Sequence, residues 1–220
     1  QAYLASIDNR DLAYANAIEI TREQTESGFI PNFGTVVGLK SRDCSQPPVG
    51  SMVIRELYRR YGDRWLLEEV FDRLLTWNRW WIEHRTHEGL LCWGSDPYSP
   101  LTGAHWETEG VNQRFGAALE SGLDNSPMYD DIPFDAQTHL MCLADVGLNG
   151  LYVMDCEALA EIAAVLGQDA AAEELRRRAR AFRTALAGLW DEATGLFLNR
   201  RTDTLDFSHR ISPTNFYALL

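Results

Sequence analysis

The sequence predicts an all-α fold in which helical hairpins repeat and close into a toroid. Helical patterns cover most of the 220 residues, and strand patterns are few. Two pairs of helical segments are each divided by a glycine, and a long aromatic segment, residues 86–135, lies between the pairs. Repeated hairpins cannot bury both of their faces alone, so they stack into a solenoid or close into a ring. The long segment favours a ring, because surface segments of that length without helix are usually functional.

The predicted elements follow in chain order from the spacing of apolar residues and from the residues at their ends. The helices are expected at residues 10–26, 48–61, 64–85, 149–166 and 168–190. The first is followed by Gly28, the second by Gly62 and the fourth by Gly167. The best strand candidate is 195–200, and residues 213–220 resemble the start of another helix.

A faint internal repeat joins these elements. A long helix and an apolar segment follow both Gly62 and Gly167, and the spans from Gly62 to Gly89 and from Gly167 to Gly195 are 27 and 28 residues. Six or seven helices are about half of what a twelve-helix barrel needs. We therefore expect residues 1–220 to be the N-terminal part of a single barrel domain, truncated at both ends.

The composition excludes several classes of function. The net charge of −12 disfavours nucleic acid, whose phosphates require clustered Lys and Arg. No apolar run approaches the roughly 20 residues that cross a bilayer, and no signal peptide is visible. The cysteines, Cys44, Cys92, Cys142 and Cys156, show no C-x-x-C spacing. We interpret them as reduced thiols, which favours a cytoplasmic protein.

Residues 120–127, Glu-Ser-Gly-Leu-Asp-Asn-Ser-Pro, are the first candidate for chemistry. Glu120 and Asp124 lie four residues apart on a turn. A carboxyl group in a partly apolar pocket has a raised pKa and can donate a proton near neutrality. Cleavage of a glycosidic bond needs such a donor and a second carboxylate across the sugar. The alternative is a structural turn or helix cap.

Three other segments carry groups suited to binding sugars, which need flat apolar faces and planar polar side chains. Asp43 and Gln46 lie in residues 42–48 before the second helix, Trp93 lies beside Asp96 in residues 92–97, and Trp106 falls later in the long segment. Residues 42–48, 92–97 and 120–127 are the three motifs at the predicted rim. Three further tryptophans, Trp77, Trp80 and Trp81, lie on one side of the third helix and are expected in the core.

Metal sites are disfavoured. His84 and His87 are three residues apart, whereas the zinc-protease pattern places its histidines four apart. Asp124, Asp130, Asp131 and Asp135 could offer oxygens to calcium, but their spacing does not match an EF-hand loop. We expect no metal.

Residues 120–127 resemble the general-acid loop of glycoside hydrolase family 63 and the related trehalases. Ser45-Gln-Pro-Pro48 and Gly28-Phe-Ile-Pro-Asn32 also resemble barrel loops of that group. Asp145-Val-Gly-Leu-Asn149, Leu151-Tyr152 and Asp155-Cys-Glu-Ala-Leu-Ala160 are similar to bacterial members of the mannosylglycerate hydrolase type. The resemblance covers the chain from about residue 28 onward.

This resemblance implies an (α/α)6 barrel and an inverting hydrolase of an α-linked glucoside or mannoside, without a cofactor. Asp124 matches the general acid. Gln46, Trp93 and Asn125 would surround the sugar, with Asp43 and Glu120 as weaker candidates for the same pocket. Two departures stand out. Cys44 replaces the Arg that often precedes Ser-Gln-Pro-Pro, and no residue from 145 to 220 matches the family's general base, a Glu. That base is expected beyond this segment, so the 220 residues alone should be inactive.

Two other functions remain open from the sequence. A sugar epimerase on a similar barrel would use histidines as acid and base, but no His lies inside the three motifs at the predicted rim. A helical module that binds carbohydrate or protein without catalysis is the second. The substrate and the oligomeric state cannot be read from the sequence.

Overall fold

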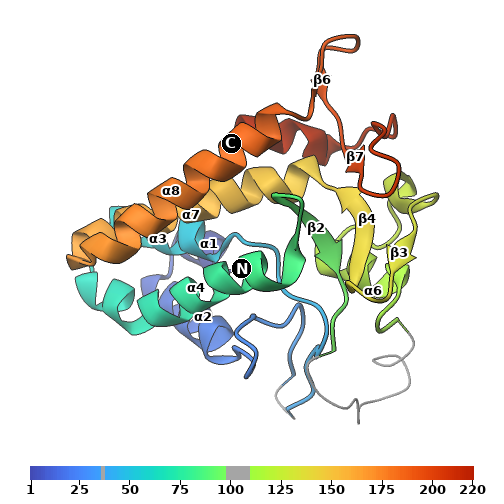
Figure 1. Ribbon diagram of the computed structural model, residues 1–220. Coiled ribbons are helices and arrows are strands. Elements are labelled where there is room, and N and C mark those ends of the chain that lie inside the picture. The colour runs from blue at the N-terminus through green and yellow to red at the C-terminus, as the bar shows by residue number, and fades with distance from the viewer. Residues whose placement is uncertain (36–37, 98–109) are drawn as a thin grey trace.

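The computed structural model describes residues 1–35, 38–97 and 110–220. Figure 1 shows long helices on one side of the molecule and a small antiparallel sheet on the other. The predicted all-α class is therefore wrong, because strands form part of the architecture. The helical hairpins themselves are present.

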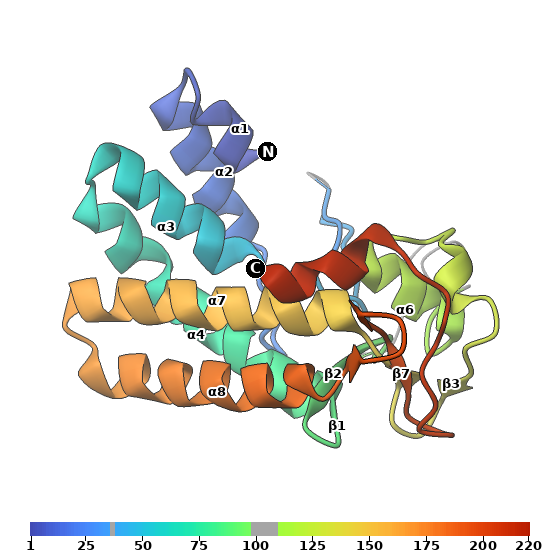
Figure 2. The same ribbon diagram turned by 90° about the horizontal axis from the view of Figure 1, so that it is seen from above.

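The long helices lie where the apolar periodicity predicts them. The helix at 64–85 covers its predicted range, and the other four predicted helices begin and end within four residues of their predicted ranges. The helices at 2–5 and 114–121 were not predicted. The helices are α1 (Ala2–Ala5), α2 (Arg10–Arg22), α3 (Gly50–Tyr61), α4 (Arg64–Arg85), α6 (Arg114–Ser121), α7 (Val146–Leu166) and α8 (Asp169–Ala187). Helix α7 lies against α3, α4 and α8 (Figure 2), which explains why most of its residues are buried.

The internal repeat is real. Gly62 and Gly167 end α3 and α7 in the left-handed conformation, each with φ of 75°, which glycine adopts without strain. A second helix and a strand hairpin follow each glycine. The hairpin after α4 is β1 (Thr86–His87) with β2 (Leu90–Gly94), and the hairpin after α8 is β5 (Trp190–Asp191) with β6 (Leu196–Phe197).

The tryptophans of α4 lie in the core, as predicted. Trp77, Trp80 and Trp81 are at most 3% exposed. Trp80 and Trp81 meet edge to face with their ring centres 5.3 Å apart, a favoured geometry for aromatic rings. Trp81 also packs edge to face on Trp93 of β2, with ring centres 5.9 Å apart, so α4 joins the helical layer to the sheet.

The sheet has the order β1-β2-β4-β3, and β7 (Arg200–Arg201) also pairs with β4 (Leu140–Ala144). Strand β3 (Phe134–Asp135) is short. The central pair, β2 and β4, is antiparallel, with Cys92 opposite Ala144 and Gly94 opposite Leu140. The register shifts between these pairs, because one residue of β2, Trp93, lies opposite residues 141–143 of β4, so the irregularity lies on β4.

The C-terminal segment, where the start of a helix was predicted, forms a 3-10 helix, η2 (Pro213–Leu219). It packs on the first turns of α7 (Figure 2). Two glycines on α7 permit this approach. A Cβ at Gly150 would lie 2.2 Å from the carbonyl oxygen of Tyr217, and one at Gly147 would lie 2.7 Å from the Cβ of Thr214.

Gly150→Ala is expected to displace η2 from α7, because the backbone of Tyr217 leaves no room for a methyl group. Overpacking of this kind costs about 1–3 kcal/mol. We expect faster amide hydrogen exchange in residues 213–220 of the full-length protein. Gly34→Ala is the matched control, since its Cβ would meet no heavy atom closer than 3.9 Å. Unchanged exchange in Gly150→Ala would contradict this packing.

Two predictions from the composition, on the cysteines and on membrane-spanning helices, can be compared with the structure. All four cysteines are free thiols, as predicted. Within the described ranges, none of the helices combines the length and the apolar character that a bilayer-spanning helix requires.

Candidate active site

The predicted acid loop follows α6 as a tight turn. Gly122 ends α6 with φ of 69°. The N–H of Ser126 then donates to the carbonyl of Leu123 at 2.8 Å, so Asp124 and Asn125 occupy the corner of a β-turn. Ser126 caps the next 3-10 helix, η1 (Pro127–Tyr129). Both corner residues are exposed. Asp124 is thus exposed in these residues, whereas the sequence analysis expected a partly apolar pocket around it.

Glu120 lies beneath this turn with no exposed surface. Its Oε1 accepts hydrogen bonds from the backbone N–H of Ser45 (2.8 Å) and from Arg85 Nη2 (2.9 Å). Its Oε2 accepts from the N–H of Gly94 (2.7 Å) and from Arg85 Nε (2.8 Å). Each oxygen thus accepts two hydrogen bonds from the protein. The structure leaves Glu120 no surface for a ligand.

Arg85, the last residue of α4, is the counterion. It is fully buried, and its guanidinium also donates to the backbone carbonyls of Asp43 (3.0 Å) and His84 (3.1 Å). Burial by itself would lower the pKa of Arg85, but the charge and hydrogen bonds of Glu120 raise it above its usual value. Burial raises the pKa of Glu120, against the opposing charge and hydrogen bonds of Arg85. Each oxygen of Glu120 nevertheless accepts two N–H donors, which suits a carboxylate, and the fork of Arg85 matches it in two parallel hydrogen bonds.

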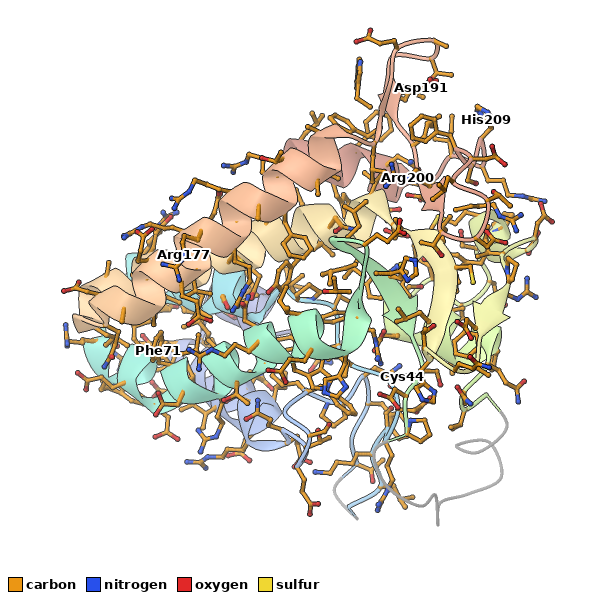
Figure 3. All side chains as sticks on the ribbon, in the orientation of Figure 1. Cys44, Phe71, Arg177, Asp191, Arg200 and His209 are labelled. Atoms are coloured by element: carbon orange, nitrogen blue, oxygen red, sulfur yellow. The ribbon has the colours of Figure 1, made fainter. Side chains whose placement is uncertain are left out.

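The segment that contains Asp43 joins this group from the side. Asp43 is 8% exposed, and its Oδ2 accepts from the hydroxyl of Ser95 (2.6 Å) and the thiol of Cys44 (3.0 Å). The backbone N–H of Asp96 donates to the carbonyl of Asp43 at 3.0 Å. Figure 3 labels Cys44 near the end of β2. Burial raises the pKa of the Cys44 thiol well above its usual range, so this thiol stays protonated.

The remaining predicted residues divide into three groups. Gln46 is partly buried, and its side-chain amide donates to the carbonyl of Asn32, which joins two of the loops that carry the resemblance. Trp93 is 4% exposed and packs edge to face on Trp81 at 5.9 Å, so its ring belongs to the core. Trp106 lies outside the described residues.

A second polar group joins Asp96 to two histidines that the sequence analysis did not connect with it. The carboxylate of Asp96 lies between His84 (3.4 Å) and His139 (3.7 Å). The hydrogen bond from His84 lowers the pKa of Asp96 most, against the opposing effect of burial. His139 also contacts Asn112 at 2.7 Å. Asp96 lies close to Trp93 in sequence, but no local signal indicates that distant His139 approaches it.

Within the described segments, no three His, Cys, Asp or Glu side chains are arranged to hold a metal ion. The carboxylates that were weighed for calcium lie apart: Asp131 pairs with Arg210, while Asp135 accepts hydrogen bonds from residues 137 and 138 of its own loop.

The chain matches a known family over nearly its whole length. The family described as mannosylglycerate hydrolase MGH1-like glycoside hydrolase domain matches residues 3–220. A comparison with the curated proteins gave no match.

Solved structures share the fold. An uncharacterized conserved protein from Thermus thermophilus has a TM-score of 0.79 at 19% identity, over 99% of this chain and 61% of the other. The GH63 mannosylglycerate hydrolase from the same organism, in complex with glucose, has a TM-score of 0.77 at 18% identity, over 99% and 62%. Neutral trehalase Nth1 from Saccharomyces cerevisiae has a TM-score of 0.71 at 15% identity, over 99% and 48%. The chain therefore spans about three fifths of the length of the Thermus structures.

Proposed function

This chain belongs to the family of mannosylglycerate hydrolase MGH1-like glycoside hydrolase domains, and on that premise we propose that the full-length protein hydrolyses an α-linked glucoside or mannoside with inversion. Candidate substrates are a glucosyl or mannosyl glycerate and short α-glucosides. The similar Thermus hydrolase is described in complex with glucose and, separately, with Tris and D-glycerate. Residues 1–220 would form the N-terminal part of one (α/α)6 catalytic domain.

One observation carries this proposal. The carboxylate of Glu120 binds the backbone of Ser45 and of Gly94, so the acid loop, the Ser-Gln-Pro-Pro loop and the end of β2 meet at one point. These are the segments whose residue types suit sugar binding. Asp124 follows Glu120 by four residues on an outward-facing turn, where a substrate can reach it.

We assign Asp124 the role of general acid, which protonates the leaving oxygen of the glycosidic bond. A carboxyl group keeps its proton near neutrality when it is removed from water. The bound sugar, together with parts of the protein outside these 220 residues, would cover the exposed turn. A Glu outside these residues would serve as general base and activate water on the opposite face of the sugar.

The other candidates take different roles in this proposal. Asn125 and Gln46 would bind sugar hydroxyls, and Asp43 would hold Ser95 at the pocket wall. Glu120 and Trp93 would support the pocket from the core. Trp106 keeps its assignment as a sugar-stacking residue. No cofactor takes part in this chemistry.

Inversion can be tested directly. We expect the full-length protein to release the β-anomer of the sugar first from an α-linked substrate, because water attacks from the face opposite the leaving group. Proton NMR in the first minutes of reaction, on mannosylglycerate, glucosylglycerate and trehalose, distinguishes the two anomers. The free sugar left to mutarotate without enzyme provides the reference spectrum. From the two glycerates, first appearance of the α-anomer would exclude the two-carboxylate inverting mechanism. Trehalose, whose leaving half is itself α-glucose, should give α- and β-glucose in equal amounts, and α-glucose alone would exclude the mechanism.

A further inference from the structure

We infer that Arg85 is a positioning residue for the acid loop: its pairing with Glu120 fixes the turn of Asp124 against the loops that carry Gln46 and Asp96. This inference rests on the proposed function, since it gives Arg85 a part in the reaction without contact to the substrate. It concerns a residue that none of the sequence motifs contains.

The geometry requires a guanidinium. Arg85 donates to both oxygens of Glu120 and to two backbone carbonyls, those of Asp43 and His84. Its guanidinium carbon lies 4.5 Å above the ring of Trp80. A planar fork with five N–H groups can satisfy these directions together, whereas an ammonium group cannot.

Glu120 links the position of Arg85 to the positions of the surrounding loops. Its oxygens accept hydrogen bonds from the backbone N–H of Ser45 and from the backbone N–H of Gly94 at the end of β2. The backbone of Glu120 itself belongs to α6, three residues before Leu123, where the turn of Asp124 begins. A rotation of this carboxylate would break both contacts at once. Arg85 prevents that rotation because it holds both oxygens from one side.

The close approach of Gly94 is an independent sign of this arrangement. A Cβ at Gly94 would lie 2.7 Å from Arg85 Nε, 2.9 Å from Arg85 Cδ and 2.7 Å from the carbonyl oxygen of His139. The end of β2 thus closes directly over the guanidinium side chain. Even a methyl group at this position would push Arg85 away from Glu120.

Stability alone does not account for such a pair. The desolvation of two buried charges can exceed their attraction, so a buried salt bridge is weak evidence for stability. A misplacement of about 1 Å in a catalytic group, by contrast, can lower the rate by about 10²-fold. A displacement of the acid loop would therefore lower the rate, because this loop carries Asp124.

Arg85→Lys in the full-length enzyme tests the inference. We expect kcat to fall by about 10²-fold with KM changed by less than about threefold, measured below the melting temperature. We also expect faster amide exchange at Ser45 and Gly94, whose N–H groups donate to Glu120. Gly94→Ala removes no charge, and we expect it to produce the same two effects if Arg85→Lys fails to fold.

Arg178→Lys is the matched control. Arg178 is also largely buried and binds Asn78 (2.6 Å) and Glu174, but within the helical layer of α4 and α8. It should lower the melting temperature and leave both kcat and the exchange at Ser45 and Gly94 unchanged.

The outcomes separate the two proposals. Normal kcat in Arg85→Lys and Gly94→Ala at full folding, or unchanged exchange at both amides, would overturn the positioning role. If the wild-type protein hydrolyses none of the three sugars, the proposed function fails, and the exchange experiment alone decides whether Arg85 orders the loops.

Discussion

Asp124→Asn is expected to lower kcat of the full-length protein by about 10²–10⁴-fold, the usual contribution of a general acid. The amide cannot donate the proton that the leaving oxygen needs. Asp124 and Asn125 form the exposed corner of the turn, so the substitution should leave the fold and sugar binding intact. Initial rates, together with binding of the unreacted sugar by calorimetry, measure the two effects separately.

Asp130→Asn provides the control for Asp124→Asn. It makes the same chemical change six residues later, at a carboxylate that is 63% exposed and pairs weakly with Arg210 at 3.7 Å. We expect near-normal turnover. A glycosyl fluoride, whose leaving group needs no proton, should restore much of the rate in Asp124→Asn. Near-normal turnover of the natural substrate by Asp124→Asn would remove this residue from the mechanism.

Asp155→Ala is expected to lower the free energy of unfolding by about 3 kcal/mol, because truncation leaves two buried donors unpaired at about 1–3 kcal/mol each. Asp155 on α7 is buried, and its oxygens accept from the N–H of Ser51 (3.0 Å) and from Asn78 Nδ2 (2.8 Å). Ser51 lies in the first turn of α3, whose own N-cap residue, Val49, offers no side-chain acceptor. Chemical denaturation of the full-length protein measures the loss.

Glu157→Ala is the comparison on the same helix. Glu157 pairs with Arg183 on the surface, where both side chains are more than one third exposed, and such pairs contribute little. We expect a change below about 1 kcal/mol. Asp155→Asn keeps one acceptor oxygen, so its loss in free energy of unfolding should lie between those of Asp155→Ala and Glu157→Ala. Equal losses in Asp155→Ala and Glu157→Ala would show that Asp155 does not cap α3.

The helical hairpins could be predicted because their signals are local. The apolar spacing in residues 64–85 defines α4 over its full length, and Gly62 and Gly167 end their helices in a conformation that glycine accepts. The spacing of Trp77, Trp80 and Trp81 likewise predicted their burial. Such features depend on a few neighbouring residues, so the sequence alone contains them.

The central strands were missed for a physical reason. Strands β2 and β4 read Leu-Leu-Cys-Trp-Gly and Leu-Met-Cys-Leu-Ala, short apolar runs without alternation. Every residue of β2 is buried, so no polar face produces the period of two that marks a half-exposed strand. A buried run of five residues has the same pattern in a helix and in a strand, and the prediction of an all-α fold followed from that ambiguity.

For the candidate site, the sequence by itself determined which residues are candidates for the chemistry, Asp124 above all, because residue type and turn signals are local. Only the tertiary structure decided how they are arranged. It buried Glu120 and Trp93, exposed Asp124, and brought Arg85 to Glu120 across 35 residues. A buried charge is tolerated only with a partner. Only the folded chain shows that Arg85, packed under Gly94, is the arginine that pairs with Glu120.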